Sequence, residues 1–296
     1  MPRFASSPAI SYGPVAGSGT RARSGVDAGT ASAIGNANKK KEYYLTEVPD
    51  LARRDGVRCG VVIVDETAVL GINTRVELAR AESEMQKRLR RRMLENGVGM
   101  LDPGTVYLSF DTVLEPEVQI EPFVVLGPGV VVRSGATIRA FSHLEGAEVG
   151  RNTIVGPYGR LRPGAVLAED VHIGNFVEVK NSRVEKGAKV NHLSYIGDAT
   201  VGEGTNIGAG TITCNFDGFD KHRTEIGAGA FIGSNTALVA PVKVGDGAYV
   251  GAGSTIAKDV APDALAVVRA EQAEKPGWAE EFRTRKKAEK ASKRPK

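Results

Sequence analysis

The sequence predicts an all-β fold over residues 100–262, a parallel β-helix built from six-residue repeats. An aliphatic residue recurs at every sixth position from Leu108 to Ile256, with few exceptions. A helix would repeat its apolar face every 3.6 residues and a simple strand every two, so the period indicates a short strand followed by a corner. Gly often follows the aliphatic residue, as in Ile173-Gly174, and the 36 glycines of the chain suit corners that need positive φ.

The repeat contains 24 aliphatic positions, which makes eight coils of three rungs. Three steps, after Leu144, Val179 and Ile196, are five residues long. The members of the series are Leu108, Leu114, Ile120, Leu126, Val132, Ile138, Leu144, Val149, Val155, Leu161, Leu167, Ile173, Val179, Val184, Val190, Ile196, Val201, Ile207, Ile226, Ile232, Leu238, Val244, Val250 and Ile256.

The series is interrupted by a 19-residue gap between Ile207 and Ile226. One six-residue rung accounts for part of it, and the remaining thirteen residues, Thr213 to Glu225, are predicted to leave the coil as a loop. Long loops in compact repeat proteins are commonly functional, and the alternative is a tolerated surface insertion.

Four further segments flank the predicted β-helix, with boundaries at 1–41, 42–75, 76–97 and 263–296. The first is rich in Gly, Ala, Ser and Lys without periodicity, which is typical of disorder. The second is predicted to be a small α/β fragment, with a helix over Leu45–Asp55 and a strand over Cys59–Val64. The third is a connecting helix over Val76–Glu95, which contains strong helix formers and no Gly or Pro. The last is expected to be a mobile tail.

The net charge of +4 gives no reason to expect a nucleic-acid partner, because of where the charge lies. Arg283 to Lys296 carries +7, so the rest of the chain sums to −3. A basic tail without interleaved aromatic residues is typical of a solvated end, and contact with a polyanion or a membrane surface is the alternative.

The chain is expected to be cytoplasmic. It has no apolar run of the roughly 20 residues that a transmembrane helix needs, and its amino terminus lacks the apolar region of a secretory signal. Its two cysteines, Cys59 and Cys214, are far apart and form no metal or redox motif, which suits a reducing compartment.

Two cations are predicted to stack on one face of the β-helix. Arg162 and Lys180 are separated by 18 residues, one full coil, and each immediately follows its rung aliphatic residue. Like charges on adjacent strands repel, and a bound anion would remove that penalty while accepting charge-assisted hydrogen bonds. The spacing therefore predicts an anion site, with two solvated surface side chains as the alternative.

A histidine lies close to this pair in the chain. His192 is twelve residues after Lys180, at the second position after its rung aliphatic residue. Histidine is the side chain best suited to take a proton near neutral pH, so His192 is a candidate general base, although a lone histidine is more often structural. Tyr195, three residues on, is expected to contact the same ligand.

Four phrases of the sequence resemble the acetyltransferase half of the GlmU family, in order and in the six-residue register. They are Gly159–Ala165 (GRLRPGA), Gly174–Lys180 (GNFVEVK), Asn191–Asp198 (NHLSYIGD) and Asn206–Gly218 (NIGAGTITCNFDG). The resemblance covers about residues 100–278. It implies a left-handed parallel β-helix of hexapeptide repeats, preceded by a small α/β remnant and a connecting helix, and a homotrimer whose sites are shared between neighbouring prisms.

The resemblance also implies an activity and a set of site residues. The activity is transfer of acetyl from acetyl-CoA to glucosamine-1-phosphate, a step in making UDP-N-acetylglucosamine for peptidoglycan and lipopolysaccharide. His192 would be the general base, and Arg162, Lys180, Tyr195 and Asn206 would bind the sugar phosphate. The residues expected to meet acetyl-CoA are Ala209, Asn215, Phe216, Ser234, Ala252 and Arg269. At Phe216 the family often has Tyr, so a hydroxyl contact is absent here.

The amino-terminal part departs from the family. Ala16–Arg21 (AGSGTR) is similar to the loop that opens the family's uridyltransferase domain, and Gly71–Arg75 (GINTR) is similar to one of its last segments. Asn73 matches a family position that helps to bind Mg²⁺, but nearly all of the domain between these segments is missing. A magnesium site needs several oxygen ligands, so we expect no uridyltransferase activity and no Mg²⁺ requirement.

Three functions follow from this interpretation. The first is a single-activity acetyltransferase with glucosamine-1-phosphate and acetyl-CoA as its small-molecule substrates. The second is a bifunctional enzyme that also uses UTP and Mg²⁺. The third is a truncated, non-catalytic trimer subunit, which would have no need of His192, Arg162, Lys180 and Asn206.

Overall fold

The computed structural model describes residues 33–56, 67 and 70–292, and it divides into two compact units, Met1–Arg88 and Leu89–Lys296. The segment Ala16–Arg21 and the strand predicted over Cys59–Val64 lie outside the described residues. No described helix is long and apolar enough to cross a membrane.

The described part of the first unit is helical. A 3-10 helix, η1 (Leu45–Glu47), leads into α2 (Val48–Arg54), which has a proline in its first turn and buries Val48 and Ala52. This confirms the helix predicted over Leu45–Asp55. The next helix, α3 (Arg75–Glu95), confirms the one predicted over Val76–Glu95.

A capping box starts α3. The Thr74 hydroxyl accepts from the Glu77 backbone N–H at 3.2 Å, and the Glu77 carboxylate accepts from the Thr74 and Asn73 N–H groups at 2.8 and 2.7 Å. The other end of α3 lies in the second unit, where Leu89 and Met93 are buried in the core of the β-helix.

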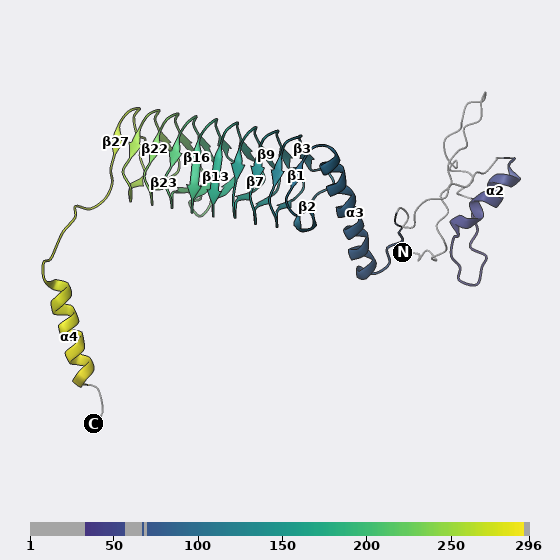
Figure 1. Ribbon diagram of the computed structural model, residues 1–296, viewed down its shortest axis with the longest axis horizontal. Helices are drawn as coiled ribbons and strands as arrows, with labels where there is room; N and C mark the ends of the chain where they lie inside the picture. Colours follow the sequence, from purple (N-terminus) through teal and green to yellow (C-terminus); the bar gives the residue numbers. More distant parts are fainter. Residues whose placement is uncertain (1–32, 57–66, 68–69, 293–296) are drawn as a thin grey trace. The chain divides into compact units, whose positions relative to one another are not determined.

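The second unit is a parallel β-helix with three flat sheets, which we call the first, second and third sheets (Figure 1). In spatial order the first sheet contains β1 (Gly99–Met100), β4 (Gln119–Ile120), β7 (Thr137–Ile138), β10 (Ile154–Val155), β13 (His172–Asn175), β16 (Lys189–His192), β19 (Asn206–Ile207), β22 (Phe231–Ile232), β25 (Tyr249–Val250) and β27 (Leu265–Ala266).

The second sheet contains β2 (Tyr107–Leu108), β5 (Val125–Leu126), β8 (His143–Leu144), β11 (Arg160–Leu161), β14 (Glu178–Lys180), β17 (Tyr195–Gly197), β20 (Ile212–Cys214), β23 (Ala237–Val239) and β26 (Thr255–Ile256). The third sheet contains β3 (Val113–Leu114), β6 (Val131–Val132), β9 (Ala147–Val149), β12 (Ala165–Leu167), β15 (Arg183–Val184), β18 (Ala199–Val201), β21 (Thr224–Ile226) and β24 (Val242–Val244). A 3-10 turn, η3 (Pro103–Thr105), precedes β2.

The core is the column of aliphatic side chains that the repeat predicts. In β11 the inward Leu161 is fully buried while Arg160 faces out, and β8 and β14 pair with it in register. Each rung alone exposes its apolar residue, and stacking the coils removes that surface from water, at about 25 cal/mol for each Å² buried.

The predicted 24 rungs are three too few, because β1, β20 and β27 were missing from the series. The inward residue of β20 is Thr213, a polar residue that is fully buried. Its hydroxyl accepts from the Gly197 N–H at 2.8 Å and donates to the Gly197 carbonyl at 3.0 Å. An aliphatic search misses this rung because hydrogen bonds, and not apolar contacts, satisfy its side chain.

The predicted loop over Thr213–Glu225 is therefore too long. Thr213 and Cys214 belong to β20, and Thr224 and Glu225 belong to β21. Residues 215–223 leave the coil, and they form a hairpin in which Phe216 and Lys221 make an antiparallel bridge. We call this segment the 215–223 hairpin.

The corner between the first and second sheets carries a stack of aromatic rings. Phe123, Phe141, Tyr158 and Phe176 lie on successive coils, with 5.0 Å between neighbouring ring centroids. All four have positive φ, between 55° and 61°, which the tight corner imposes. The stack ends at the coil before His192.

The tail contains a helix that the sequence analysis did not predict, α4 (Trp278–Ser292). Its first turns carry a stacked pair, Trp278 and Phe282, with Arg285 5.7 Å from the centre of the Phe282 ring. Its side chains, as far as they are described, are exposed.

Candidate active site

The register of the second sheet brings the two predicted cations together. Strand β11 pairs with β14 so that Leu161 is opposite Val179, which places Arg162 beside Lys180 on adjacent strands. Arg162 Nη1 lies 2.8 Å from the Glu178 carboxylate, and Lys180 Nζ lies 3.5 Å from that of Asp198. The expected stacking is present, and each cation also has a carboxylate beside it.

Asp198 anchors this group of side chains. Its carboxylate is 7% exposed and accepts hydrogen bonds from the side-chain amides of Asn181 and Asn215, in addition to its ion pair with Lys180. Burial acts to raise the pKa of Asp198, but the two amides and the Lys180 ammonium outweigh it, so its pKa is lowered. The negative charge is therefore fixed beneath Lys180.

A third cation, Lys221, reaches the same place from the 215–223 hairpin. The neighbouring Lys180 amine is the main cause that lowers the pKa of Lys221, as expected when two cations are brought together. Arg162 also acts to lower the pKa of Lys221. The group Arg162, Lys180 and Lys221, which we call the cation cluster, is suited to a ligand that carries two negative charges.

Tyr195, predicted to contact the same ligand, lies beside this cluster. It lies on β17, which pairs with β14 so that Tyr195 is opposite Glu178. The Asn215 amide is 3.5 Å from the Tyr195 hydroxyl and is almost fully buried. Asn215 thus lies beside the cation cluster, bound to Asp198, while the neighbouring Phe216 is 59% exposed.

His192 lies at the corner between the first and second sheets, at the end of β16. Its imidazole is exposed, and Nδ1 is 2.7 Å from the side-chain oxygen of Asn175, its partner on β13. Because an amide oxygen can only accept, the proton of the neutral imidazole is on Nδ1, and the lone pair is on Nε2. Asn175 thus orients a ring whose free nitrogen can accept a proton.

The residues expected to meet acetyl-CoA continue along the same corner, one coil after another. The Gly210 N–H binds the His192 carbonyl at 3.3 Å, the Asn235 N–H binds Ala209 at 2.7 Å, and the Gly253 N–H binds Ser234 at 2.8 Å. Arg269 Nη1 then binds the Ala252 carbonyl at 2.8 Å. Ala209, Ser234 and Ala252, which we call the small-residue row, therefore line one edge that begins at His192 and ends at Arg269.

Glycine lets these coils approach closely. A Cβ on Gly208 would lie 2.5 Å from the Ser234 nitrogen, and one on Gly233 would lie 2.4 Å from that of Ala252. Both distances are too short for any side chain. The glycine that follows the rung aliphatic residue in the repeat is therefore what builds this edge.

Asn206 is not brought to the cation cluster. It lies on the first sheet, in register with Lys189 on one side and Phe231 on the other, whereas Arg162, Lys180 and Tyr195 lie on the second sheet. One copy of the chain therefore does not assemble all of the predicted sugar-binding residues.

Asn73 lies at the start of α3, where its N–H takes part in the capping of the helix. Among the described residues, no group of three or more His, Cys, Asp or Glu side chains could hold a metal ion.

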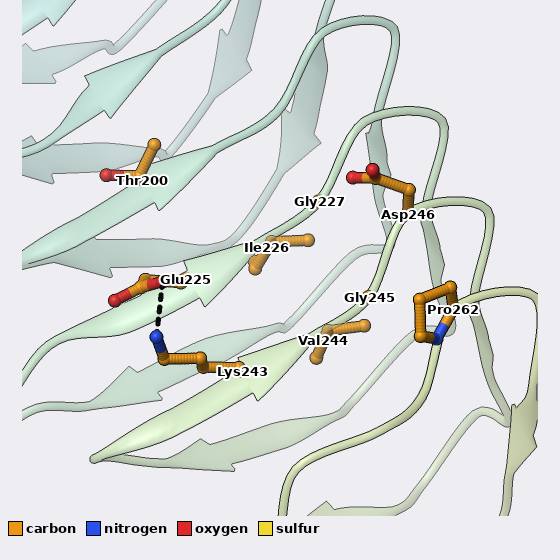
Figure 2. A pocket seen from close by; sticks show the side chains of 9 residues that line it. All are labelled: Thr200, Glu225, Ile226, Gly227, Lys243, Val244, Gly245, Asp246 and Pro262. Carbon is orange, nitrogen blue, oxygen red and sulfur yellow. Dashed lines mark ion pairs between the residues drawn. The ribbon is translucent and has the colours of Figure 1, made fainter.

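A hollow on the third sheet contains none of the predicted site residues. Figure 2 shows Thr200, Glu225, Lys243, Asp246 and Pro262 along its wall. Glu225 and Lys243 form an ion pair at 3.1 Å, and the Asp246 carboxylate accepts from the Ala228 N–H at 2.7 Å. The charges of this hollow are paired within the chain, and it presents no group of cations like the cation cluster.

Sequence reasoning missed Asn175, Asp198 and Lys221. Asn175 precedes His192 by 17 residues and Asp198 follows Asn181 by 17, which is one coil in this part of the chain, so the repeat did offer a signal for both. Lys221 gave no such signal, because the fold of the hairpin decides where it points.

The comparison with known proteins first indicates a class of protein. A family model described as "Bacterial transferase hexapeptide (six repeats)" matches residues 223–258. Together with the three parallel sheets, this confirms the expected fold class, a left-handed parallel β-helix of hexapeptide repeats. Residues 223–258 are thus similar to the hexapeptide repeats of bacterial transferases.

Individual relatives match a much longer part of the chain than the family model does. The bifunctional protein GlmU of Paramagnetospirillum magneticum is 54% identical over 260 residues, which are 88% of this chain and 58% of that protein. GlmU of Ruegeria sp. strain TM1040 is 58% identical over 265 residues, which are 90% of this chain and 59% of that protein. The chain is thus similar to GlmU over most of its length and spans less than two thirds of the length of these relatives. Among solved structures, LpxA from Acinetobacter baumannii is 16% identical with a TM-score of 0.45, and the match covers 61% of this chain and 76% of LpxA.

Proposed function

We propose that the chain is an acetyltransferase that moves the acetyl group of acetyl-CoA to the amine of glucosamine-1-phosphate. The observation that best supports this activity is the position of His192. It lies on the corner between the cation cluster of the second sheet and the small-residue row, so a phosphate-bearing acceptor and an extended acyl donor would meet beside its free Nε2.

The proposed reaction needs one proton acceptor. The amine of glucosamine-1-phosphate is cationic near neutral pH and must lose a proton before it attacks. His192 Nε2 would take that proton, while the Asn175 oxygen on Nδ1 would stabilise the resulting imidazolium. The amine nitrogen then forms a bond to the carbonyl carbon, the carbon–sulfur bond breaks, and the thiolate of CoA leaves and is protonated.

The cation cluster would select the phosphate. The cluster contains three cationic side chains, those of Arg162, Lys180 and Lys221, whereas a phosphate monoester carries two negative charges. Glu178 and Asp198 compensate part of the excess positive charge. Tyr195 would contact the sugar from β17. Glucosamine without phosphate would use none of these charges, so the cluster supports a sugar phosphate as the acceptor.

Acetyl-CoA would lie along the small-residue row. Ala209, Ser234 and Ala252 leave room for a narrow chain along the edge, and Arg269, at the far end, would face the phosphates of CoA. Asn215 and Phe216 of the 215–223 hairpin complete the proposed set. Since acetyl-CoA is an intracellular metabolite, we also propose that the protein is cytoplasmic.

A homotrimer with shared sites is part of this proposal. Asn206 and the cation cluster lie on different sheets of one chain, so both would contact one sugar if Asn206 came from a neighbouring copy. The parallel β-helix has flat faces that suit such an arrangement. We do not propose uridyltransferase activity or a Mg²⁺ requirement, because no feature of the described residues favours them.

The test is a thiol-release assay on the purified chain. Acetyl-CoA and glucosamine-1-phosphate are mixed with the protein, free thiol is followed by a chromogenic disulfide, and the N-acetylated product is identified by mass. A blank without acceptor corrects for the two cysteines of the chain. Thiol release with glucosamine-1-phosphate but not with glucosamine supports the proposal, and absence of release contradicts it.

A further inference from the structure

The 215–223 hairpin is closed by hydrogen bonds of its own. The His222 N–H donates to the Asn215 carbonyl at 2.8 Å, and Phe216 pairs with Lys221 as an antiparallel bridge. The backbone alone therefore sets where the hairpin begins and ends.

One side chain, Asp217, holds the interior of the hairpin. Its Oδ1 accepts from the N–H groups of Phe219 and Asp220 at 2.8 and 2.7 Å, and its Oδ2 accepts from His222 Nε2 at 2.7 Å. The hydrogen bond from His222 lowers the pKa of Asp217 most, followed by the two backbone bonds, so the group is a carboxylate at neutral pH. Because a carboxylate only accepts, Nε2 of His222 carries the proton.

The hairpin brings two functional side chains to the second sheet. Asn215, at its start, binds Asp198, and Lys221, near its end, contacts Lys180. The second contact is unfavourable on its own, since both groups are ammonium ions. A free hairpin would relax by moving Lys221 away from Lys180.

We propose that Asp217 and His222 form a lock that positions Lys221 within the cation cluster against this repulsion. The proposal rests on the proposed function, because the cluster is where the sugar phosphate would bind. Asp217 and His222 are positioning residues and touch no substrate. Their effect passes through Lys221, whose ammonium is preorganised for the phosphate before the phosphate arrives.

A double-mutant cycle tests this coupling. Lys221→Ala is expected to raise the KM for glucosamine-1-phosphate about tenfold, the effect of losing one charge-assisted hydrogen bond. Asp217→Ala is expected to raise it by a similar factor. The double variant is expected to be no worse than Lys221→Ala alone, because a lock without its lysine has nothing to position.

A rescue experiment separates the lock from mere folding. His222→Ala removes the donor to Asp217 and is expected to raise the same KM, whereas His222→Gln retains an N–H donor and is expected to restore it to within about twofold of the wild type. Asp220→Ala is the matched control. It removes a carboxylate from the same hairpin, but Asp220 bonds to Asp217 through its backbone alone, so the KM of this variant is expected to stay at the wild-type value.

The outcomes are distinct. If wild-type protein releases no thiol from acetyl-CoA, the proposed function itself fails. In an active enzyme, additive effects of Asp217→Ala and Lys221→Ala, or no difference between His222→Ala and His222→Gln, would overturn the lock. Thermal unfolding of every variant is measured alongside. If the KM changes followed a general loss of stability and not the state of Lys221, the lock would be overturned as well.

Discussion

Separate replacement of Arg162 and Lys180 by Ala tests whether the cation cluster binds phosphate, and the structure gives the two changes different consequences. Arg162 is 42% exposed, and its neighbour Glu178 is 37% exposed and can be solvated. Lys180 is 20% exposed and is the cation beside Asp198, which is 7% exposed. The first change removes a proposed phosphate contact, and the second also leaves a buried carboxylate without its cation.

The magnitudes follow from these contacts. Loss of one hydrogen bond between charged groups weakens binding by about 1.5–3 kcal/mol, which lowers kcat/KM for glucosamine-1-phosphate by about tenfold to a hundredfold in either variant. Lys180→Ala is also expected to destabilise the fold by about 1–3 kcal/mol, because Asp198 keeps only its two amide partners. At about 2–4 °C for each kcal/mol in a domain of this size, its Tm falls by several degrees. Arg162→Ala keeps the wild-type Tm.

The assay compares glucosamine-1-phosphate with glucosamine in wild type and both variants, with unfolding followed by circular dichroism. The variants should lose their advantage for the phosphorylated acceptor and keep whatever rate the wild type shows with glucosamine. Equal losses on both acceptors would refute phosphate recognition by these residues. An equal fall in Tm in both variants would refute the distinction drawn from the burial of Asp198.

Three further predictions concern the rungs, the corner and acid stability. Thr213→Val leaves the buried Gly197 N–H without its acceptor, so chemical denaturation should show a loss of about 1–3 kcal/mol, and a gain would contradict the account of the hidden rung. Gly233→Ala places a Cβ 2.4 Å from the Ala252 nitrogen, and we expect a lower Tm and a higher KM for acetyl-CoA, with unchanged values as the contrary result. The pKa of Asp198 is lowered in the folded state, so its contribution to stability is complete above the ordinary range of an aspartate and is lost as the pH falls through the lowered value. Denaturation across that range should therefore show a smaller loss in Asp198→Asn than in the wild type.

The repeating part of the structure could be predicted from the sequence, because the spacing of residues in a β-helix determines which of them lie on adjacent strands. Arg162 and Lys180 are one coil apart and follow the same rung position, and the structure places them on adjacent strands. The same spacing does not reveal a rung whose inward side chain is polar. Thr213 completes a rung through hydrogen bonds, so the predicted loop began too early and ended too late.

Other parts of the site depend on contacts that no period encodes. Lys221 reaches Lys180 only because the hairpin folds back, and Asn206 is separated from Tyr195 because successive rungs turn onto different sheets. Helix α4 lacks a broad apolar stripe, so the pattern of its sequence indicates a charged tail and not a helix.

The central claim is that His192 serves as the general base for acetyl transfer, and a single-turnover measurement tests it most directly. The rate of N-acetylglucosamine-1-phosphate formation is compared between the wild type and His192→Ala with both substrates saturating. His143→Ala is the control, since His143 lies on β8 outside the proposed site. General-base catalysis contributes about 10²- to 10⁴-fold, so His192→Ala should be slower by that factor while His143→Ala matches the wild type. A His192→Ala variant as fast as the wild type would contradict the account.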